Sequence, residues 1–494
     1  MSNRPETNKQ SCPVYKKCGG CQLQNLSYPE QLEFKQKKVE KLLKRFCTVE
    51  KIIGMKTPYH YRNKVQAAFY TDKKGKIISG VYQSGSHHVV GIDSCQTEDV
   101  IADKIIVAVR KLLPSFRMTT YNEDTGKGFL RHILVKRGFA TNQIMLVLVT
   151  GTPVFPSKNN FVKAILKQFP EITTIVQNIN PYRTNLVLGD HQKVLYGKGY
   201  IEDILCGCRF RISPKSFYQI NPVQTEVLYG KAIEFANLKG NETVLDTYCG
   251  IGTIGIIAAK NGAGNVIGAE LNGDAVRDAI VNARANNLKN IRFYKADAGE
   301  FMREAADEDE KPDVVFMDPP RAGSDRKFLD SLIKMSPKKV VYVSCSPETL
   351  ARDLAYLTQN SPYKAQKIQP VDMFPHTAHI ETVVLLSHKK PDGHINVKVE
   401  FGEGEGKVPL DNIAKRAEEY KPKERVTYKM IKEYIEAKYG FKVHTAYIAE
   451  VKRDLGLPMY DAPNAVEELK QPRKHPTPEK VEAIKDALKH FEVI

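Results

Sequence analysis

A cysteine and a glutamate far apart in the chain form a pair of side chains that could carry out covalent chemistry. Cys345 follows the β-rich run KVVYVS, and Glu381 begins the apolar run ETVVLL. A thiolate can add to an electron-poor ring, and a carboxylate beside it can later remove a proton. If neighbouring loops bring both side chains into one nucleotide-type crevice, the pair favours covalent catalysis on a pyrimidine.

The glycine-rich segment at residues 249–255 has the setting of a cofactor loop. It follows the predicted strand ETVLD and opens the predicted helix GTIGIIAAKNG, and Glu270 ends the next predicted strand. Glycines let the backbone approach a nucleotide closely, and an acid about 20 residues later accepts hydrogen bonds from ribose hydroxyls. The same pattern fits NAD, so this loop does not identify the cofactor by itself.

A further candidate is Asp318, which begins the segment Asp-Pro-Pro-Arg at the end of a predicted strand of the same sheet. The two prolines lack N–H groups and restrict the loop. The carboxyl ends of the strands are where ligands bind in open α/β sheets, so the loop directs Asp318 toward a ligand. An NAD dehydrogenase has no particular need for such a loop.

Cysteines near the N-terminus predict a metal site. Cys12, Cys18 and Cys21 lie close together, and Cys95 is a distant candidate for a fourth ligand. Four thiolates can hold an iron–sulfur cluster or a tetrahedral zinc ion. The ligand type alone leaves the choice between iron–sulfur and zinc open.

The charge balance favours a polyanionic partner. The 494 residues include 74 Lys and Arg against 57 Asp and Glu, a net charge of +17. Nucleic acid is the commonest partner of such a basic surface, although a lysine-rich protein without that role is the alternative. No apolar run approaches the roughly 18 residues needed to span a bilayer, and MSNRPETNKQS lacks the apolar core of a secretory signal. We therefore expect a cytoplasmic protein with no membrane contact and no stable protein partner.

The predicted elements divide the chain into three parts. Residues 1–209 combine the cysteine segment, a basic helix and short alternating strands, which predicts a β-rich domain with antiparallel hairpins. Residues 210–390 alternate strands and helices, which predicts a Rossmann-like α/β domain with IETVVLLSH as a late edge or antiparallel strand. Residues 391–494 contain a predicted linker, GEGEGK, and helical patterns, which predict a helical C-terminal extension.

Seven motifs, in the family's order, make the chain resemble the iron–sulfur-containing RNA 5-methyluridine methyltransferases that modify uridines in 23S rRNA. They lie within about residues 12–388 and are CPVYKKCGGCQLQ, GFLRHILVKRG, SPKSFYQINPVQTE, LDTYCGIGTIGI, MDPPRAG, YVSCSPETLARDL and DMFPHTAHIETVVLL. The helical tail after residue 390 is not part of the family's common core.

The resemblance implies an S-adenosylmethionine-dependent methyltransferase fold, a [4Fe–4S] cluster on the four cysteines named above, and 23S rRNA as the substrate. Carried over by motif, the cofactor contacts fall on Gln219, Tyr248, Glu270 and Asp318. Cys345 would be the nucleophile and Glu381 the general base, with Phe217 helping to form the target pocket.

The expected mechanism begins with attack of the Cys345 thiolate on uracil C6, which makes C5 able to accept a methyl group. Glu381 then removes the C5 proton, and elimination releases the thiolate. The target base is expected to leave its stack, while the basic segments KQKKVEKLLKR and LRHILVKR contact phosphates. The cluster is expected to stabilise the RNA-binding domain.

Three alternatives remain at this point. The first is a transfer-RNA uridine methyltransferase with the same chemistry, although such relatives generally lack the cysteine segment. The second is an NAD-dependent oxidoreductase with an accessory zinc site. The third is a non-catalytic RNA-binding protein on a degenerate methyltransferase fold.

Overall fold

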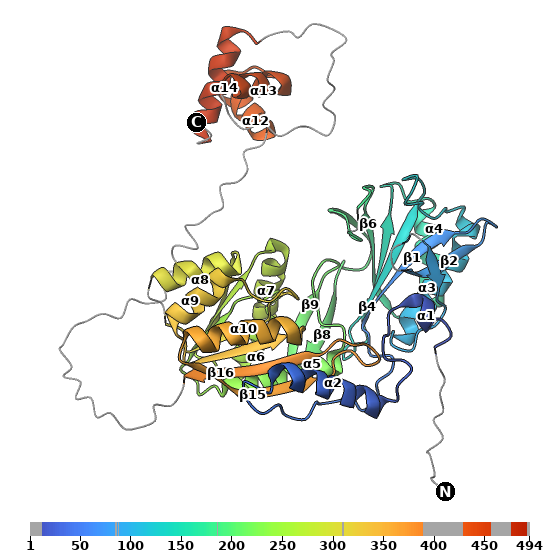
Figure 1. Ribbon diagram of the computed structural model, residues 1–494. Coiled ribbons are helices and arrows are strands. Elements are labelled where there is room, and N and C mark those ends of the chain that lie inside the picture. Colours follow the sequence, from blue (N-terminus) through green and yellow to red (C-terminus); the bar gives the residue numbers. More distant parts are fainter. Residues whose placement is uncertain are drawn as a thin grey trace, which may run out of the picture. The chain divides into compact units, whose positions relative to one another are not determined.

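The computed structural model describes residues 12–83, 86, 88–184, 186–308, 311–388, 428–455 and 476–491. The chain forms two compact units, Met1–Phe401 and Gly402–Ile494 (Figure 1). The predicted linker GEGEGK and the N-terminal segment MSNRPETNKQS lie outside the described residues. In the part of the chain that is described, no helix has both the length and the apolar character needed to cross a membrane.

The first unit begins with helices α1 (Tyr15–Cys18) and α2 (Tyr28–Leu43) and a seven-stranded sheet of order β3-β2-β1-β4-β5-β6-β7. Its strands are β1 (Lys64–Thr71), β2 (Ile77–Tyr82), β3 (Val89–Gly91), β4 (Leu130–Arg137), β5 (Ile144–Thr150), β6 (Ile172–Ile179) and β7 (His191–Tyr196). All neighbouring strands are antiparallel except β5 and β6, which are parallel. The predicted antiparallel hairpins therefore account for most of this sheet.

The predicted basic helix is α2, whereas the helices that lie among the strands of this sheet were not predicted. They are α3 (Val100–Leu112), the short 3-10 helix η1 (Pro114–Phe116) and α4 (Lys158–Gln168). The start of α3 has a clear sequence signal, because the Asp99 side chain accepts hydrogen bonds from the backbone N–H groups of Ile101 and Ala102. Helix α4 is the crossover that allows β5 and β6 to run parallel.

The prediction that LRHILVKR contacts phosphates is wrong. This segment is β4, which lies between β1 and β5, and Arg131 and Lys136 are both buried in it. Every residue of β4 before Arg137 is buried, so Arg131 and Lys136 serve internal contacts. The other basic segment lies in α2, beside β15 (Figure 1), and its Lys35 is fully buried in an ion pair with Asp372.

The second sheet also has seven strands, in the order β12-β11-β10-β13-β14-β16-β15. They are β10 (Thr243–Asp246), β11 (Asn265–Glu270), β12 (Ile291–Lys295), β13 (Val314–Met317), β14 (Lys339–Ser344), β15 (Tyr363–Val371) and β16 (Glu381–His388). The helices of this part are α5 (Pro222–Ala236), α6 (Thr253–Lys260), α7 (Gly273–Ala285), α8 (Ala298–Asp307), α9 (Arg326–Met335) and α10 (Pro347–Asn360) (Figure 1).

Strands β10 to β14 are parallel, as predicted, whereas β16 is antiparallel to both of its neighbours. Strand β16 is not at the edge, because the unpredicted strand β15 covers it. The sequence of β16 is apolar enough for burial on both faces, and an inner position satisfies both its side chains and its backbone.

A small hairpin of β8 (Ile201–Leu205) and β9 (Cys208–Ile212) crosses the predicted domain boundary at residues 209/210. One hydrophobic cluster includes Val147 and Val176 of the first sheet, Phe210 of the hairpin, and Phe316 and Val341 of the second sheet. The two sheets therefore share a continuous core, which fixes the loops between them.

The second unit contains α12 (Tyr428–Tyr439), α13 (Thr445–Asp454) and α14 (Pro478–His490). These helices have a hydrophobic cluster of their own, which includes Ile431, Ile435, Ile448 and Ile484. This arrangement matches the helical patterns seen in the sequence.

Candidate active site

The structure places Cys345 and Glu381 side by side. Cys345 directly follows β14, and Glu381 is the first residue of the neighbouring strand β16. Ser344 pairs with Thr382 in the antiparallel register, so the next residue pair along the two chains is Cys345 with Glu381. The predicted pair thus meets at the end of β14 where ligands bind in α/β sheets.

The surroundings of Cys345 and Glu381 disfavour the ionised form of both side chains. Burial raises the pKa of Cys345 to about 11, and the carboxyl groups of Glu381 and Asp318 act in the same direction. Burial and Asp318 also hold the pKa of Glu381 well above its ordinary range. Arg321 opposes both shifts. A thiolate here depends on nearby positive charge, and Arg321 supplies one cation.

The loop after β13 is rigid. Asp353 on α10 accepts hydrogen bonds from the Ser324 N–H at 3.0 Å and the Tyr342 hydroxyl at 2.8 Å. Gly323 has a φ of +75°, and a Cβ there would lie 2.6 Å from the Asp353 carboxylate and the Arg352 guanidinium. Only glycine fits this turn, which fixes the direction of the preceding Asp318-Pro-Pro-Arg segment.

Three carboxyl groups gather at the glycine-rich loop. Glu270 accepts the Gly250 N–H at 3.0 Å, and Asp246, at the end of β10, accepts the Gly255 N–H at 2.8 Å. Burial raises the pKa of Asp246 to about 7, with Asp318 and Glu270 adding to the shift. Burial likewise raises the pKa of Asp318 to about 7. A cationic ligand would relieve this crowding of acids.

One oxygen at this site has no protein partner. Asp246 Oδ1 is buried and accepts no hydrogen bond from the residues that the structure describes. Leaving a buried acceptor unpaired is costly, so the atom marks a position where a donor from a ligand would be favourable.

The remaining predicted cofactor residues lie around the same loop. The Tyr248 hydroxyl is 3.4 Å from Ser324 Oγ, and burial raises its pKa to about 12. The side chain of Gln219 lies near the hydroxyl of Tyr229 on α5, and so does Thr253 at the start of α6; both oppose the rise that burial causes in the pKa of Tyr229. Gln219 is thereby connected to the glycine-rich loop across α5.

The segment between β9 and α5 is held by buried Lys136, which belongs to the segment predicted to contact RNA phosphates. Lys136 Nζ donates to the carbonyl oxygens of Ser213 and Ser216, both at 2.8 Å. Asp278 on α7 accepts from the Ser213 hydroxyl at 2.9 Å and the Ser216 hydroxyl at 2.6 Å. This fixed segment presents Phe217, whose side chain is 64% exposed.

Replacing Lys136 with methionine is expected to change how stability depends on pH. Burial, reinforced by Lys64, lowers the pKa of Lys136 from 10.5 to about 7 in the folded chain. Between these values the unfolded chain binds more protons, so the lysine's contribution to stability rises with pH. The wild type should gain about 2 kcal/mol relative to Lys136→Met between pH 7 and pH 9. Urea unfolding of both proteins at the two pH values measures this, and a constant difference would contradict it.

The loop before Glu381 is tied to the N-terminal segment. His376, with a φ of 69°, donates its backbone N–H to Gln31 Oε1 at 2.8 Å, and its carbonyl accepts the Leu23 N–H at 2.9 Å. The Ala378 N–H donates to Gln22 Oε1 at 3.2 Å. The segment just after the N-terminal cysteines therefore positions the loop that carries the candidate base.

The predicted cysteine ligands are partly gathered. Burial raises the pKa of Cys21 to about 11, and the nearby thiols of Cys95 and Cys18 add to the shift. Burial also raises the pKa of Cys18, with Cys12 contributing. Among the residues described, no group of three or more His, Cys, Asp or Glu side chains has the arrangement of a metal site.

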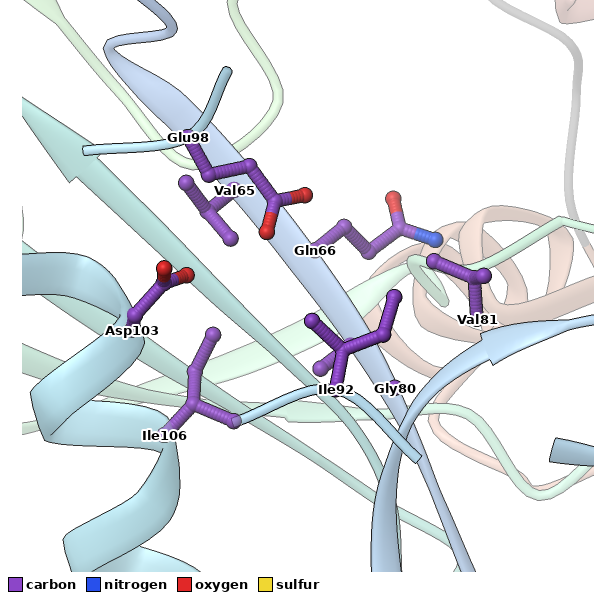
Figure 2. A pocket seen from close by; sticks show the side chains of 9 residues that line it. Val65, Gln66, Gly80, Val81, Ile92, Glu98, Asp103 and Ile106 are labelled. Carbon is purple, nitrogen blue, oxygen red and sulfur yellow. The ribbon is translucent and has the colours of Figure 1, made fainter. Parts of the chain in front are cut away.

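A small cavity lies beside Cys95. Figure 2 shows the carboxyl groups of Glu98 and Asp103 at this cavity, which lies between β1, β2 and α3. Its volume is about 10 Å³, and the Cys95 N–H donates to Asp103 Oδ2 at 2.8 Å. Burial, with Asp103 next in effect, raises the pKa of Glu98 to about 8. The cavity is large enough for about one water molecule, too small for a substrate.

Comparison with known proteins identifies the family. The family model described as tRNA (Uracil-5-)-methyltransferase matches residues 182–389. An uncharacterized RNA methyltransferase from Bacillus cereus is 44% identical over 388 residues, covering 78% of this chain and 84% of the relative. One from Listeria monocytogenes is 46% identical over 379 residues, covering 76% and 83%. This chain belongs to the RNA (uracil-5-)-methyltransferase family.

A solved structure agrees with this assignment. The tRNA (uracil-54, C5)-methyltransferase of Pyrococcus abyssi, in complex with S-adenosyl-L-homocysteine, is 30% identical with a TM-score of 0.63. The match covers 74% of this methyltransferase and 85% of that chain. The predicted methyltransferase fold is confirmed, and the alternatives of an NAD-dependent oxidoreductase and a non-catalytic protein are set aside.

Three residues of the site were not predicted from the sequence. Arg321 is part of the Asp-Pro-Pro-Arg motif, yet only the structure places its charge against Cys345 and Glu381. Asp246 ends the strand before the glycine-rich loop, and an acid at that position is a signal that the sequence offers. Lys136 carries no such signal, because an internal lysine and an RNA-binding lysine look alike in sequence.

Proposed function

We propose that this methyltransferase transfers a methyl group to C5 of a uridine in 23S rRNA through a covalent adduct between Cys345 and C6 of the base. The observation that carries the proposal is the adjacency of Cys345 and Glu381, with Arg321 close enough to favour the charged form of both. A nucleophile beside a base suits a reaction in which a thiol adds to the ring and a proton later leaves it.

The residues have distinct roles in this reaction. S-adenosylmethionine, when bound, supplies the methyl group as an electrophile. The Cys345 sulfur forms a bond to C6, which moves an electron pair toward C5 and allows C5 to form a bond to the methyl carbon. The methyl–sulfur bond of the cofactor would break at the same time and leave S-adenosyl-L-homocysteine. Glu381 then takes the C5 proton, and the electrons of that C–H bond restore the double bond as the C6–sulfur bond breaks. Arg321 favours the thiolate before attack and after release.

The site also fits the cofactor. S-adenosylmethionine carries positive charge, and the acids Asp246, Glu270 and Asp318 converge at the glycine-rich loop. The unpaired Asp246 Oδ1 offers an acceptor at the same place. Gln219 and Tyr248 border this loop, so we assign all five residues to cofactor binding.

The substrate is tested by incubating the protein with labelled S-adenosylmethionine and either unmodified 23S rRNA or unmodified transfer RNA. 5-Methyluridine confined to 23S rRNA is the expected result. Label in transfer RNA alone would overturn the proposed substrate and leave the chemistry in place. Label in neither RNA, with the cofactor bound, would overturn the proposed function.

Transfer RNA is the second candidate substrate. The observation that favours it is the likeness to the Pyrococcus abyssi enzyme, whose name gives uracil 54 of tRNA as its target. The N-terminal cysteine segment favours 23S rRNA instead, because it is one of the motifs by which the sequence resembles the iron–sulfur-containing methyltransferases of 23S rRNA.

We also propose that Cys12, Cys18, Cys21 and Cys95 hold a [4Fe–4S] cluster that stabilises the N-terminal region. Thiolates are the ligands that such clusters use. The thiols of Cys18 and Cys95 both influence Cys21, although Cys95 is distant in sequence. Glycine at position 20 leaves room beside a sulfur, because a Cβ there would lie 3.3 Å from Cys18 Sγ.

Replacing Cys18 with serine is expected to remove bound iron and lower the melting temperature, because a hydroxyl is a poor ligand for iron in such a cluster. Iron, sulfide and zinc are measured in protein purified without oxygen. Cys206→Ser is the matched control, since Cys206 is also half-buried but lies in the β8–β9 turn. Equal iron in both variants, or zinc in place of iron in the wild type, would contradict the cluster.

A further inference from the structure

The exposed edge of the first sheet has an unusual surface. It comprises the loop after β6 and the strand β7, residues 182–198, which we call the β7 ribbon. Four large apolar side chains there are well exposed: Tyr182 (65%), Leu186 (71%), Val194 (51%) and Tyr196 (43%). Single exposed apolar residues are ordinary, but several along one edge mark an interaction surface.

Positive charge accompanies these side chains. Arg183, Lys193 and Lys198 are exposed, and none of them joins an ion pair among the residues that the structure describes. The acidic Asp190 lies next to Lys215, with 3.5 Å between the ammonium and the carboxylate. The β7 ribbon therefore combines unpaired cations with exposed aromatic rings.

The loop of the ribbon is held in place from beneath. Buried Arg131 donates to the carbonyl oxygens of Asn180 at 3.0 Å and Tyr182 at 2.8 Å, and Glu123 holds the same guanidinium at 2.9 and 2.7 Å. The Asn180 side chain donates to the Leu186 carbonyl at 2.7 Å. A surface that is already ordered loses little entropy when a partner binds, which is typical of a binding site.

The ribbon also adjoins the segment that presents Phe217. Lys215 Nζ is 3.5 Å from both the Asp190 carbonyl and its carboxylate, and β7 begins at the next residue, His191. Lys215 precedes Phe217 by two positions on the segment held by Lys136. A strand of RNA that leaves the neighbourhood of Phe217 would therefore meet the ribbon.

We propose that the β7 ribbon binds the single-stranded RNA that flanks the target nucleotide. Bases stack on Tyr182 and Tyr196, and phosphates contact Arg183, Lys193 and Lys198. Aromatic rings beside cations are the recurring elements of single-strand binding. Lysine on an open sheet edge disfavours pairing with another protein strand, which argues against a protein partner. The inference rests on the proposed function in taking RNA as the substrate.

The test measures binding of a fluorescein-labelled 20-nucleotide oligouridine by anisotropy from low to high salt. Lys193→Ala/Lys198→Ala should reduce the steepness of the log–log salt dependence by about 1.4, since each phosphate contact on a single strand contributes about 0.7. Tyr182→Ala should weaken binding by about 5- to 150-fold, the loss expected for one stacked base. Lys158→Ala/Lys163→Ala, which removes two exposed lysines of α4, should leave both quantities unchanged.

Melting temperature and S-adenosylmethionine affinity should match the wild type in every variant, which shows that the fold is intact. Unchanged affinity and salt dependence in the ribbon variants would overturn the inference. A concentration-dependent dimer that Tyr182→Ala disrupts would assign the ribbon to a protein contact instead. If the variants lose oligouridine binding but no RNA is methylated by the wild type, the proposed function fails while the ribbon stands. If the wild type methylates RNA and the ribbon variants bind oligouridine normally, the inference about the ribbon fails while the proposed function stands.

Discussion

Cys345→Ala is expected to reduce RNA methylation by at least about 10⁴-fold and to leave S-adenosylmethionine binding unchanged. Without the sulfur, no bond forms at C6, and C5 of the uracil ring keeps its low reactivity toward a methyl donor. The proposed cofactor residues lie at other places in the sheet: Asp246 and Glu270 end β10 and β11, Tyr248 and Asp318 follow β10 and β13, and Gln219 precedes α5. Single-turnover methylation and equilibrium binding of the cofactor give the two quantities.

Cys47→Ala is the matched control for this experiment. Cys47 is also half-buried, and burial raises its pKa to about 11, as for Cys345. The two thiols differ in their surroundings, because Glu381, Asp318 and Arg321 act on the pKa of Cys345, whereas Glu50 acts on that of Cys47. Cys47→Ala should retain wild-type turnover. Substantial methylation by Cys345→Ala would exclude the covalent mechanism, whatever the control shows.

The raised pKa of Cys345 has a consequence for catalysis. A thiol with a pKa of about 11 is almost entirely protonated at neutral pH, so the free enzyme is poorly nucleophilic. Arg321 lowers this pKa, and a positively charged cofactor at the neighbouring acids would lower it further.

The parallel sheet and its loops could be predicted from the sequence, because its apolar strands end in recognisable segments such as Asp318-Pro-Pro-Arg. The sequence was not sufficient for the meeting of Cys345 and Glu381. That contact requires β16 to turn antiparallel and insert between β14 and β15, and β15 has no strong strand pattern. The residue types suggested the pair and the resemblance to a family gave each residue its expected role, but neither showed the contact.

The location of basic side chains, on the surface or in the interior, was the feature hardest to predict from the sequence. The motif LRHILVKR looks like a phosphate-binding segment, yet Arg131 and Lys136 are buried and hold loops by their carbonyl oxygens. A buried cation is stabilised by several acceptors at once, and these acceptors come from segments far away in sequence. The same two residues hydrogen-bond the loops that carry Tyr182 and Phe217, so their contribution to the proposed RNA binding would be indirect.

The N-terminal segment and the catalytic loop form one continuous network. Lys35 on α2 is paired with Asp372 at 2.5 Å and donates to the Phe374 carbonyl at 3.0 Å, and Tyr28 also donates to Asp372. Helix α2 follows the cysteine segment directly. The N-terminal region therefore contacts the loop before Glu381, and these contacts would give the proposed cluster a structural route to the candidate active site.

Glu381→Gln is expected to trap the protein–RNA adduct and to lower turnover by about 10²- to 10⁴-fold. Glutamine preserves the shape of the buried side chain but cannot take the C5 proton, so the C6–sulfur bond is not released after methyl transfer. High burial and the neighbouring Asp318 raise the pKa of Glu381, which makes its carboxylate a strong base once ionised. Denaturing gel electrophoresis with labelled RNA measures the adduct as a slowly migrating band.

Two further variants isolate the role of this carboxyl group. The double variant Cys345→Ala/Glu381→Gln should give no adduct, because the trapped bond is to the Cys345 sulfur. Glu348→Gln, which removes an exposed carboxylate paired with Lys38, should show wild-type turnover and no band. Normal product release by Glu381→Gln would remove Glu381 as the base. An adduct that persists in the double variant would show that another nucleophile had reacted.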